Sequence, residues 1–365
     1  MSNVAINGRF LGRRLTGVDR FALEVVRALD EQLAAGVPEL AGIQVRLLLP
    51  PGCPMPPTFK QIKVEHVGHR GGQLWEQWDL PRAVAADELL LSLCNTAPLL
   101  RRKQVVVIHD AATEAVPQAF STGFRLWYRL LMPLLGRRAL RVATVSEFSR
   151  SELQRAYGIS PHKIDVVVEG GEHIRREPAG IDALSRFGLS GRPYLLAVSS
   201  MAAHKNFRLV LEALSMMAEP PFDVVIAGGA NAKVFGDAGK VDDERIHWLG
   251  YVSDGELAAL YQQAWAFVFP SIYEGFGIPP LEAMQWGCPV VAARAASIPE
   301  VCGDAALYFD PRNAGELVAA LQRLAADDGL RQYLSDEGRK RAALFSWPQA
   351  ARQVADVCRR ALEEA

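Results

Sequence analysis

The sequence predicts an α/β protein made of two doubly wound parallel sheets in tandem. Short apolar runs rich in β-branched residues alternate with amphipathic stretches almost from end to end, which is typical of β-α units. The 365 residues, half of them apolar, suffice for two domains with separate cores. After Ile174 a charged stretch punctuated by Gly and Pro, residues 174–193, interrupts the alternation and indicates a connection between domains.

The expected strands form two series, one in each half of the chain. The first comprises residues 4–9, 45–49, 89–93, 105–109, 142–145 and 165–168, and the second 194–198, 224–227, 246–249, 267–269, 290–292 and 307–309. Helices are expected at residues 206–217 and 255–263, and capping boxes at Ser149–Glu152 and Ser253–Glu256 mark two helix starts. In open parallel sheets the functional loops follow the carboxyl ends of strands, so two such domains are expected to enclose a cleft.

Composition excludes several classes of protein. The net charge is −1 and no dense basic patch or zinc-finger pattern occurs, which argues against nucleic-acid binding. The first thirty residues carry charges in an amphipathic order without an apolar signal core, so we expect neither standard secretion nor a membrane span. Five widely spaced cysteines favour reduced thiols in a cytoplasm over disulfides or a zinc site.

The stretch YEGFGIPPLEAM, residues 273–284, is the strongest candidate for a functional site. It follows an apolar run, so Glu274 is expected at the carboxyl end of a strand. The glycines allow close backbone approach to a ligand, and the helix start offers unpaired N–H groups suited to a phosphate. Glu282 falls in or near the first helical turn, and two carboxylates are suitable partners for sugar hydroxyls. Spacing alone also fits a solvated Glu274 and a Glu282 that complements the helix dipole.

Residues 273–311 closely resemble the donor-site signature of retaining glycosyltransferases of family four. Segments 15–29, 74–81, 105–117, 142–153 and 199–207 are also similar to that family, so the likeness covers most of the chain. The resemblance implies the GT-B fold, in which two Rossmann-like domains face a cleft. It places an acceptor-binding domain at 1–176, a nucleotide-sugar-binding domain at 190–345, and a C-terminal helix at 346–365 that packs back on the first domain.

The resemblance also implies roles for residues of the second domain. Glu282 would bind the ribose of a nucleotide-sugar, and Glu274 would lie beside the transferred sugar, close to the reaction. Lys205 would neutralise the diphosphate, as a departing anion requires. Many members carry an arginine where this chain has Ser200, and His204 or Arg208 could replace that cation. The other donor contacts implied are Tyr251, Val252, Gly275, Phe276, Gly277 and Ile278.

In the first domain the resemblance implies a diphosphate contact at Gly17 and a site residue at His109, beside the donor sugar. Acceptor contacts would come from Asp110, Ser146 and Glu147, although Ser146 could simply end its strand. Without the resemblance, Gly17 and His109 fit ordinary structural roles equally well.

A mechanism without a metal ion is expected, because the sequence contains no D-x-D motif to hold a cation at the diphosphate. Retention could proceed through a carboxylate nucleophile, as in glycosidases. For the family a front-face route is usually proposed, in which the leaving phosphate deprotonates the acceptor, and no separate cofactor is expected.

Residues 124–141, FRLWYRLLMPLLGRRALR, are apolar, aromatic and basic without an acid. They are too short and too charged to span a bilayer. They could form a helix that rests on anionic lipid, or equally a core helix with arginines on its solvent-exposed side. Residues 1–180 hold about 23 Lys and Arg against about 18 Asp and Glu, which favours the lipid contact. We therefore expect a cytoplasmic protein, peripheral on the inner face of the cell membrane.

Within the family, EGFGIPPLEAM and SIPEVCGDAALYFDP resemble bacterial mannosyltransferases of surface-polysaccharide assembly most. This resemblance implies transfer of a hexose, mannose from GDP-mannose, to a growing glycan or a polyprenyl-diphosphate-linked acceptor. Donors with UDP or dTDP and other sugars remain open, as does an inactive GT-B protein that only binds a sugar nucleotide. A nicotinamide-dependent oxidoreductase is disfavoured because no G-x-G-x-x-G follows any expected strand.

Overall fold

The computed structural model describes residues 2–56, 59–180, 183–189, 191–198, 202–229 and 243–364. The chain divides into two compact units. Unit 1 comprises Met1–Glu114, Ser121–Glu169 and Trp347–Ala365, and unit 2 comprises Ala115–Phe120 and Gly170–Ser346. The chain therefore leaves unit 1 between Glu169 and Gly170, and the described part of segment 174–193 lies in unit 2.

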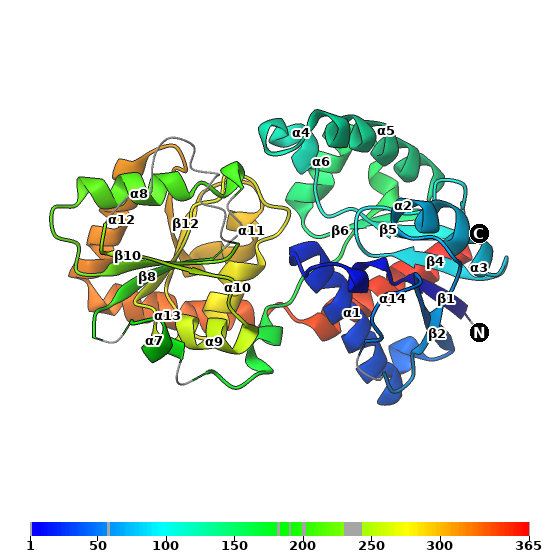
Figure 1. Cartoon of the computed structure of the whole chain (residues 1–365), viewed down its shortest axis with the longest axis horizontal. Helices are drawn as coiled ribbons and strands as arrows, with labels where there is room; N and C mark the ends of the chain where they lie inside the picture. Colours follow the sequence, from blue (N-terminus) through cyan, green and yellow to red (C-terminus); the bar gives the residue numbers. More distant parts are fainter. Residues whose placement is uncertain are drawn as a thin grey trace. The chain divides into compact units, whose positions relative to one another are not determined.

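Unit 1 contains a seven-stranded parallel sheet in the order β3-β2-β1-β4-β5-β6-β7 (Figure 1). The strands are β1 (Ser2–Asn7), β2 (Ile43–Leu49), β3 (Lys63–His66), β4 (Leu89–Ser92), β5 (Gln104–Val107), β6 (Arg141–Thr144) and β7 (Ile164–Val166). All four residues of β4 and of β5 are buried, as expected for strands covered by helices on both faces.

Helices cover both faces of this sheet (Figure 1). They are α1 (Gly17–Ala34), α2 (Gly72–Leu74), α3 (Leu80–Ala83), α4 (Ala112–Ala115), α5 (Thr122–Arg138), α6 (Glu147–Tyr157) and α14 (Trp347–Glu363), with a π-helical stretch at Trp75–Asp79. The C-terminal helix α14 packs against α1, and the fully buried Trp347 meets Phe21 with ring centroids 6.2 Å apart. The last helix is thus part of the core of unit 1.

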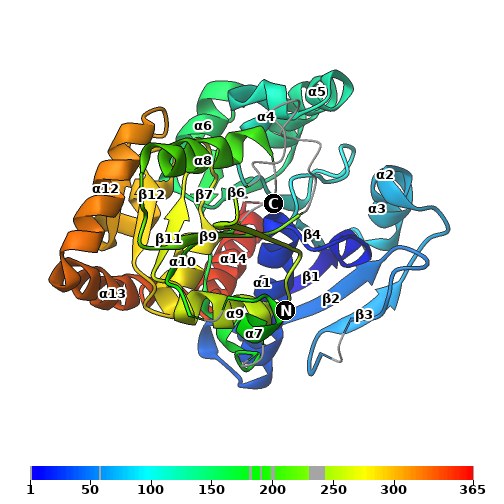
Figure 2. The same ribbon diagram turned by 60° about the vertical axis from the view of Figure 1, so that its left-hand side comes forward.

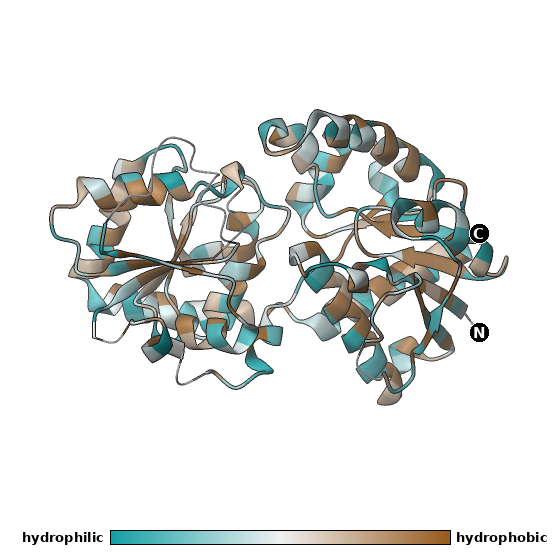
Figure 3. Ribbon diagram, in the orientation of Figure 1, coloured by the Kyte–Doolittle hydropathy of each residue, from teal (hydrophilic) through white to brown (hydrophobic). Residues whose placement is uncertain are grey.

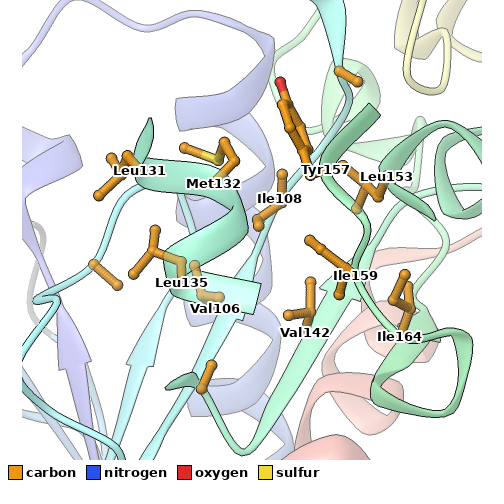
Figure 4. Packing of buried hydrophobic residues seen from close by; sticks show 13 residues of the cluster. Val106, Ile108, Leu131, Met132, Leu135, Val142, Leu153, Tyr157, Ile159 and Ile164 are labelled. Carbon is orange, nitrogen blue, oxygen red and sulfur yellow. The ribbon is translucent and has the colours of Figure 1, made fainter. Parts of the chain in front are cut away.

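Helices α5 and α6 close the core over β5 and β6 (Figure 4). Leu131 and Leu135 of α5 point toward Val106 and Val142 of the sheet, and Leu153 of α6 completes the cluster. The opposite face of α5 leaves five large apolar side chains between 41% and 59% exposed: Phe124, Leu126, Trp127, Leu130 and Leu134. The helix therefore combines a buried face with an exposed apolar one.

Unit 2 contains a six-stranded parallel sheet in the order β10-β9-β8-β11-β12-β13. Its strands are β8 (Tyr194–Val198), β9 (Asp223–Ala227), β10 (Ile246–Gly250), β11 (Ala266–Phe269), β12 (Val290–Ala293) and β13 (Ala306–Phe309), and hydrophobic residues dominate the strands of both sheets (Figure 3). Its helices are α7 (Ala183–Arg186), α8 (Phe207–Met216), α9 (Asp254–Gln263), α10 (Ile278–Gln285), α11 (Ile298–Cys302), α12 (Ala314–Ala326) and α13 (Asp328–Ala342).

Short 3-10 turns complete the described chain: η1 (Arg9–Gly12), η2 (Pro38–Leu40), η4 (Pro117–Ala119), η5 (Pro161–Lys163), η6 (Glu172–Arg175), η7 (Ala203–Lys205) and η9 (Gly303–Ala305). Across the described residues, no helix is long and apolar enough to cross a membrane.

Two local predictions need correction. Strand β3, at the outer edge of the first sheet in Figure 2, was not predicted because its residues KVEH are exposed or only half-buried and carry charges. The predicted capping box at Ser149–Glu152 is wrong, because α6 begins at Glu147 and Ser146 accepts a hydrogen bond from the Ser149 N–H. The box at Ser253–Glu256 is confirmed at the start of α9.

Candidate functional site

Each sheet reverses its winding at one point, between β1 and β4 in unit 1 and between β8 and β11 in unit 2. Loops that diverge at such a point leave a crevice at the carboxyl ends of the strands, where ligands of open α/β sheets bind. The chain after β8 leads to Lys205, and the chain after β11 leads to Glu274. The winding of the second sheet therefore brings two predicted site residues to one place.

Lys205 and Glu274 form an ion pair although 69 positions separate them in the sequence. The Lys205 Nζ lies 2.8 and 3.0 Å from the two carboxylate oxygens, and both side chains are largely buried. The following residue, Asn206, has a φ of +59° and donates its side-chain amide to the carbonyls of Pro270 and Pro311. This amide ties the turn that carries Lys205 to the loop that carries Glu274.

His204 lies beside this pair but does not supply a second cation at neutral pH. Burial, with a smaller contribution from the charge of Lys205, lowers the pKa of His204 to about 4. The imidazole is therefore neutral near pH 7, and His204 is a poor replacement for the missing arginine. Arg208 is exposed at the start of α8. Ser200 lies outside the residues that the structure describes.

The loop from Glu274 to Gly277 is fixed from behind by Ser297. The fully buried Ser297 hydroxyl lies 3.0 Å from the Glu274 carbonyl and 2.7 Å from the Phe276 carbonyl, within donating distance of both. Gly277 has a φ of +117°, a conformation that only glycine adopts without strain. Two carbonyls of the loop are thus fixed by one buried hydroxyl.

Helix α10 begins directly after this loop with the sequence Ile278, Pro279, Pro280. The two prolines have no N–H, so the donors at this helix start belong chiefly to Gly277 and Ile278. Gly277 and Ile278 were both predicted to contact the nucleotide-sugar. The N–H groups that have no partner within the helix therefore lie directly after Gly275 and Phe276.

Glu282 lies one turn into α10 and is held on both carboxylate oxygens. The Tyr261 hydroxyl, from α9, donates to Oε2 at 2.9 Å, and the His173 Nε2, from η6, lies 2.9 Å from Oε1. All three residues are buried. Burial and the adjacent Glu282 carboxylate raise the pKa of Tyr261, so this phenol remains a donor.

In unit 1, His109 follows β5 and is buried with acceptors on both ring nitrogens. Its Nε2 lies 2.9 Å from the Leu93 carbonyl and its Nδ1 lies 3.4 Å from Glu169. Burial alone would lower the pKa of His109, but the hydrogen bond and charge of Glu169 outweigh it and raise the pKa. The ring therefore favours the imidazolium form, and its backbone N–H donates to Asn95 at 2.8 Å.

The other predicted residues of unit 1 also lie at carboxyl ends of strands. Gly17 is the first residue of α1, with open space around its Cα, and Asp110 accepts a hydrogen bond from the Ala112 N–H. The Ser146 hydroxyl is fully buried as the cap of α6. Glu147 is exposed and paired with Arg150 at 3.3 Å. The structure thus gives Ser146 a structural task.

Two remaining predictions concern a nucleobase contact and a metal ion. Tyr251, directly after β10, is 65% exposed, whereas the neighbouring Val252 is buried. Within the described part of the chain, no three His, Cys, Asp or Glu side chains come together as metal ligands would.

Four residues that support this site were not predicted from the sequence: His173, Asn206, Tyr261 and Ser297. Ser297 stands before the helix start IPEV, where a serine usually suggests a helix cap. Asn206 carries a weak signal, since asparagine is the residue other than glycine that most readily adopts positive φ. His173 and Tyr261 carry no local signal, because their partner Glu282 is far away in sequence.

Comparison with protein families matches almost the whole chain. Residues 15–170 match the model described as Glycosyltransferase Family 4, and residues 185–341 match the one described as Glycosyl transferases group 1. Among solved structures, sucrose-phosphate synthase from Thermosynechococcus elongatus has the same fold, with a TM-score of 0.77 over 100% of both chains at 19% identity. The two Rossmann-like sheets and the returning C-terminal helix are thus the GT-B fold, as predicted.

Curated relatives include bacterial mannosyltransferases. The chain is 35% identical over 223 residues to the O-antigen chain mannosyltransferase B of Escherichia coli and 28% identical over 243 residues to the O-antigen chain mannosyltransferase RfbU of Salmonella typhimurium. These matches cover 58% and 65% of this chain and the same shares of the relatives. The chain thus spans less than two thirds of the length of these relatives. From the two family matches, the chain is a glycosyltransferase built from a Glycosyltransferase Family 4 domain and a Glycosyl transferases group 1 domain.

Proposed function

We propose that the protein transfers mannose from GDP-mannose, with retention of configuration, to a lipid-linked or growing polysaccharide acceptor. The observation that carries the proposal is the arrangement at the winding reversal of the second sheet. Lys205, Glu274 and the free N–H groups at the start of α10 gather there, and Glu282 follows one turn along the helix. Two similar curated proteins are O-antigen mannosyltransferases, which favours mannose as the sugar and a polysaccharide as the acceptor.

In this proposal the site stabilises the charge of the departing diphosphate. Lys205 supplies a cation, and Gly277 and Ile278 supply N–H groups at the positive end of the α10 dipole. These contacts take the place of a divalent cation. Glu282 accepts hydrogen bonds from the ribose hydroxyls, and Tyr251 and Val252 lie beside the nucleobase.

Glu274 positions the transferred sugar and is not a covalent nucleophile in this proposal. Both of its oxygens lie within 3.0 Å of the Lys205 ammonium, and such an ion pair reduces the tendency of a carboxylate to attack carbon. The leaving phosphate would instead take the proton of the acceptor. His109 of unit 1 would lie beside the donor sugar, with Asp110 beside the acceptor.

We further propose that α5 rests on an anionic membrane surface at the inner face of the cell membrane. Its exposed face carries the five large apolar side chains given above, and Arg129 and Arg137 are exposed on the same helix. No acid occurs between Thr122 and Arg138. A basic helix with exposed aromatic and aliphatic side chains is suited to the headgroup region of anionic lipid.

Thermal unfolding in the presence of nucleotides tests the donor. GDP at millimolar concentration should raise the Tm by several degrees, and more than UDP or dTDP does, because a ligand that binds only the folded state stabilises it. GDP-mannose and a polyprenyl-diphosphate-linked glycan should then yield a product one hexose heavier. The variant Glu274→Gln should keep the GDP-induced shift and lose roughly a hundredfold in turnover. The absence of a shift with all three nucleotides would contradict a transferase function.

A further inference from the structure

The structure gives Glu282 an unusual environment for a carboxylate that is to bind a ligand. Its side chain is buried, yet each oxygen has already one protein partner: the Tyr261 hydroxyl on Oε2 and the His173 Nε2 on Oε1. A carboxylate oxygen has two lone-pair directions, so one direction on each oxygen is left. Two neighbouring hydroxyls of a ribose need two such acceptor directions.

The two partners come from separate elements, and both elements are anchored. Tyr261 belongs to the buried face of α9 and packs edge-on against Phe267 of β11, with ring centroids 5.5 Å apart. His173 belongs to η6, which packs against α9 and α10. Gly171 lies so close to α10 that an added Cβ would come within 3.0 Å of the Leu281 side chain. The donors to Glu282 are therefore held in place before any ligand arrives.

We propose that His173 and Tyr261 are positioning residues that fix the rotamer of Glu282 for the ribose diol of the donor. The Nε2 of His173 lies 2.9 Å from Oε1, close enough to attract the carboxylate when that nitrogen carries its proton. Tyr261 and His173, one beside each oxygen, restrict both the torsion and the plane of the carboxylate. The nucleotide then meets an acceptor that is already oriented, which lowers the entropic cost of binding.

This inference rests on the proposed function, since it assumes that a nucleotide ribose binds at Glu282. The readout is the ratio of two dissociation constants, for GDP and for 2′,3′-dideoxy-GDP, measured by calorimetry on the same preparation. If part of the protein is inactive, the measured number of binding sites falls, but the ratio of the two dissociation constants does not change. The wild-type protein should bind GDP at least about tenfold more tightly than the dideoxy form, because the latter leaves Glu282 without its ribose partners.

Variants of His173 and Tyr261 distinguish a role in positioning Glu282 from a role in folding. Tyr261→Phe and His173→Leu should each reduce the ratio about three- to tenfold, through weaker GDP binding and with little change for the dideoxy form. His173→Gln keeps an N–H near the Nε2 position and should restore most of the ratio. In turnover, the donor KM should rise while kcat stays within about twofold, because the group acts in binding.

Two matched controls lie in the same unit. Tyr194→Phe removes a buried tyrosine hydroxyl that donates to the Leu260 carbonyl at 2.7 Å, one residue from Tyr261. His247→Gln alters a histidine whose Nε2 lies 3.1 Å from Asp223. Both should keep the wild-type ratio. If wild-type protein binds no nucleotide, the proposed function is wrong; if it discriminates but Tyr261→Phe and both His173 variants discriminate equally well, the positioning role is wrong.

Discussion

His109 shows how a single buried side chain can be set to one protonation state. Both of its ring nitrogens face acceptors, the Leu93 carbonyl and the Glu169 carboxylate, so the doubly protonated ring satisfies both. Glu169 offsets the cost of burying the charge, and the pKa of His109 is raised. The raised pKa shifts the ring toward the imidazolium form, which can donate to both acceptors.

Replacing Glu169 by Gln should destabilise the protein in a pH-dependent way. A raised pKa in the folded state contributes stability that is fully present below the unfolded value of about 6.5 and is lost as pH rises through the folded pKa. The loss in free energy of unfolding for Glu169→Gln should thus be roughly 3 kcal/mol at pH 6 and smaller at pH 9. Urea unfolding at the two pH values measures it.

The control for this prediction is Glu152→Gln, which removes a carboxylate that pairs with Arg155 rather than with a histidine. Its effect should be small and equal at both pH values. An equal loss for Glu169→Gln at pH 6 and pH 9 would show that His109 is not held as an imidazolium.

At the scale of elements, α5 has one apolar face that packs on the sheet and another that is largely exposed among the described residues. Leu131, Met132 and Leu135 pack on the sheet, while Leu126 and Leu130 are 59% and 58% exposed. Lys163 donates to the carbonyls of Arg137 and Ala139 at the end of this helix. The helix is thus well anchored, and its outward apolar face is a fixed feature of the fold.

The double variant Leu126→Ser with Leu130→Ser should weaken binding to lipid vesicles. We expect the wild-type protein to co-sediment with vesicles containing anionic phosphatidylglycerol and to do so less at high salt. The double variant should lose roughly tenfold in partitioning, because two leucines no longer enter the interface. Leu344→Ser, an equally exposed leucine of unit 2, is the control. Equal binding to neutral and anionic vesicles would contradict the proposed surface.

Most strands were predictable because burial on both faces produces apolar runs such as LLLS in β4 and AFVF in β11. Strand β3 was not, since an edge strand with exposed charges has no such pattern. The observed strand ends also differ from the predicted ones by a residue or two. In β1, for example, Ser2 and Asn3 pair with β2 before the apolar run begins.

Candidate site residues could be chosen from the sequence, but their pairing could not be predicted. The motif around Glu274 and Glu282 was visible in the sequence through family resemblance. The ion pair of Lys205 with Glu274 was not, because it depends on β8 and β11 being neighbours in the sheet. Likewise, the partners of Glu282 come from α9 and η6, and only tertiary packing brings them to α10.

At the scale of the whole molecule, the proposed function predicts turnover without a divalent cation. Dialysis against EDTA should leave kcat unchanged within about twofold, because Lys205 and the N-terminus of α10 supply the compensating charge. Replacing Lys205 by Met should lower kcat by roughly a hundredfold. Restoration of a lost activity by Mg²⁺ after EDTA treatment would instead require a metal in the mechanism.

The segment from Glu169 to His173 has a consequence for the length of the chain. Glu169 pairs with His109 in unit 1, and four positions later His173 pairs with Glu282 in unit 2. Connections between domains usually tolerate inserted residues. Here each pair lies within its own unit, so the part of the connection that can lengthen is confined to the three residues between Glu169 and His173. A substitution of Glu169 or His173 would therefore free the connection from the unit that holds that end.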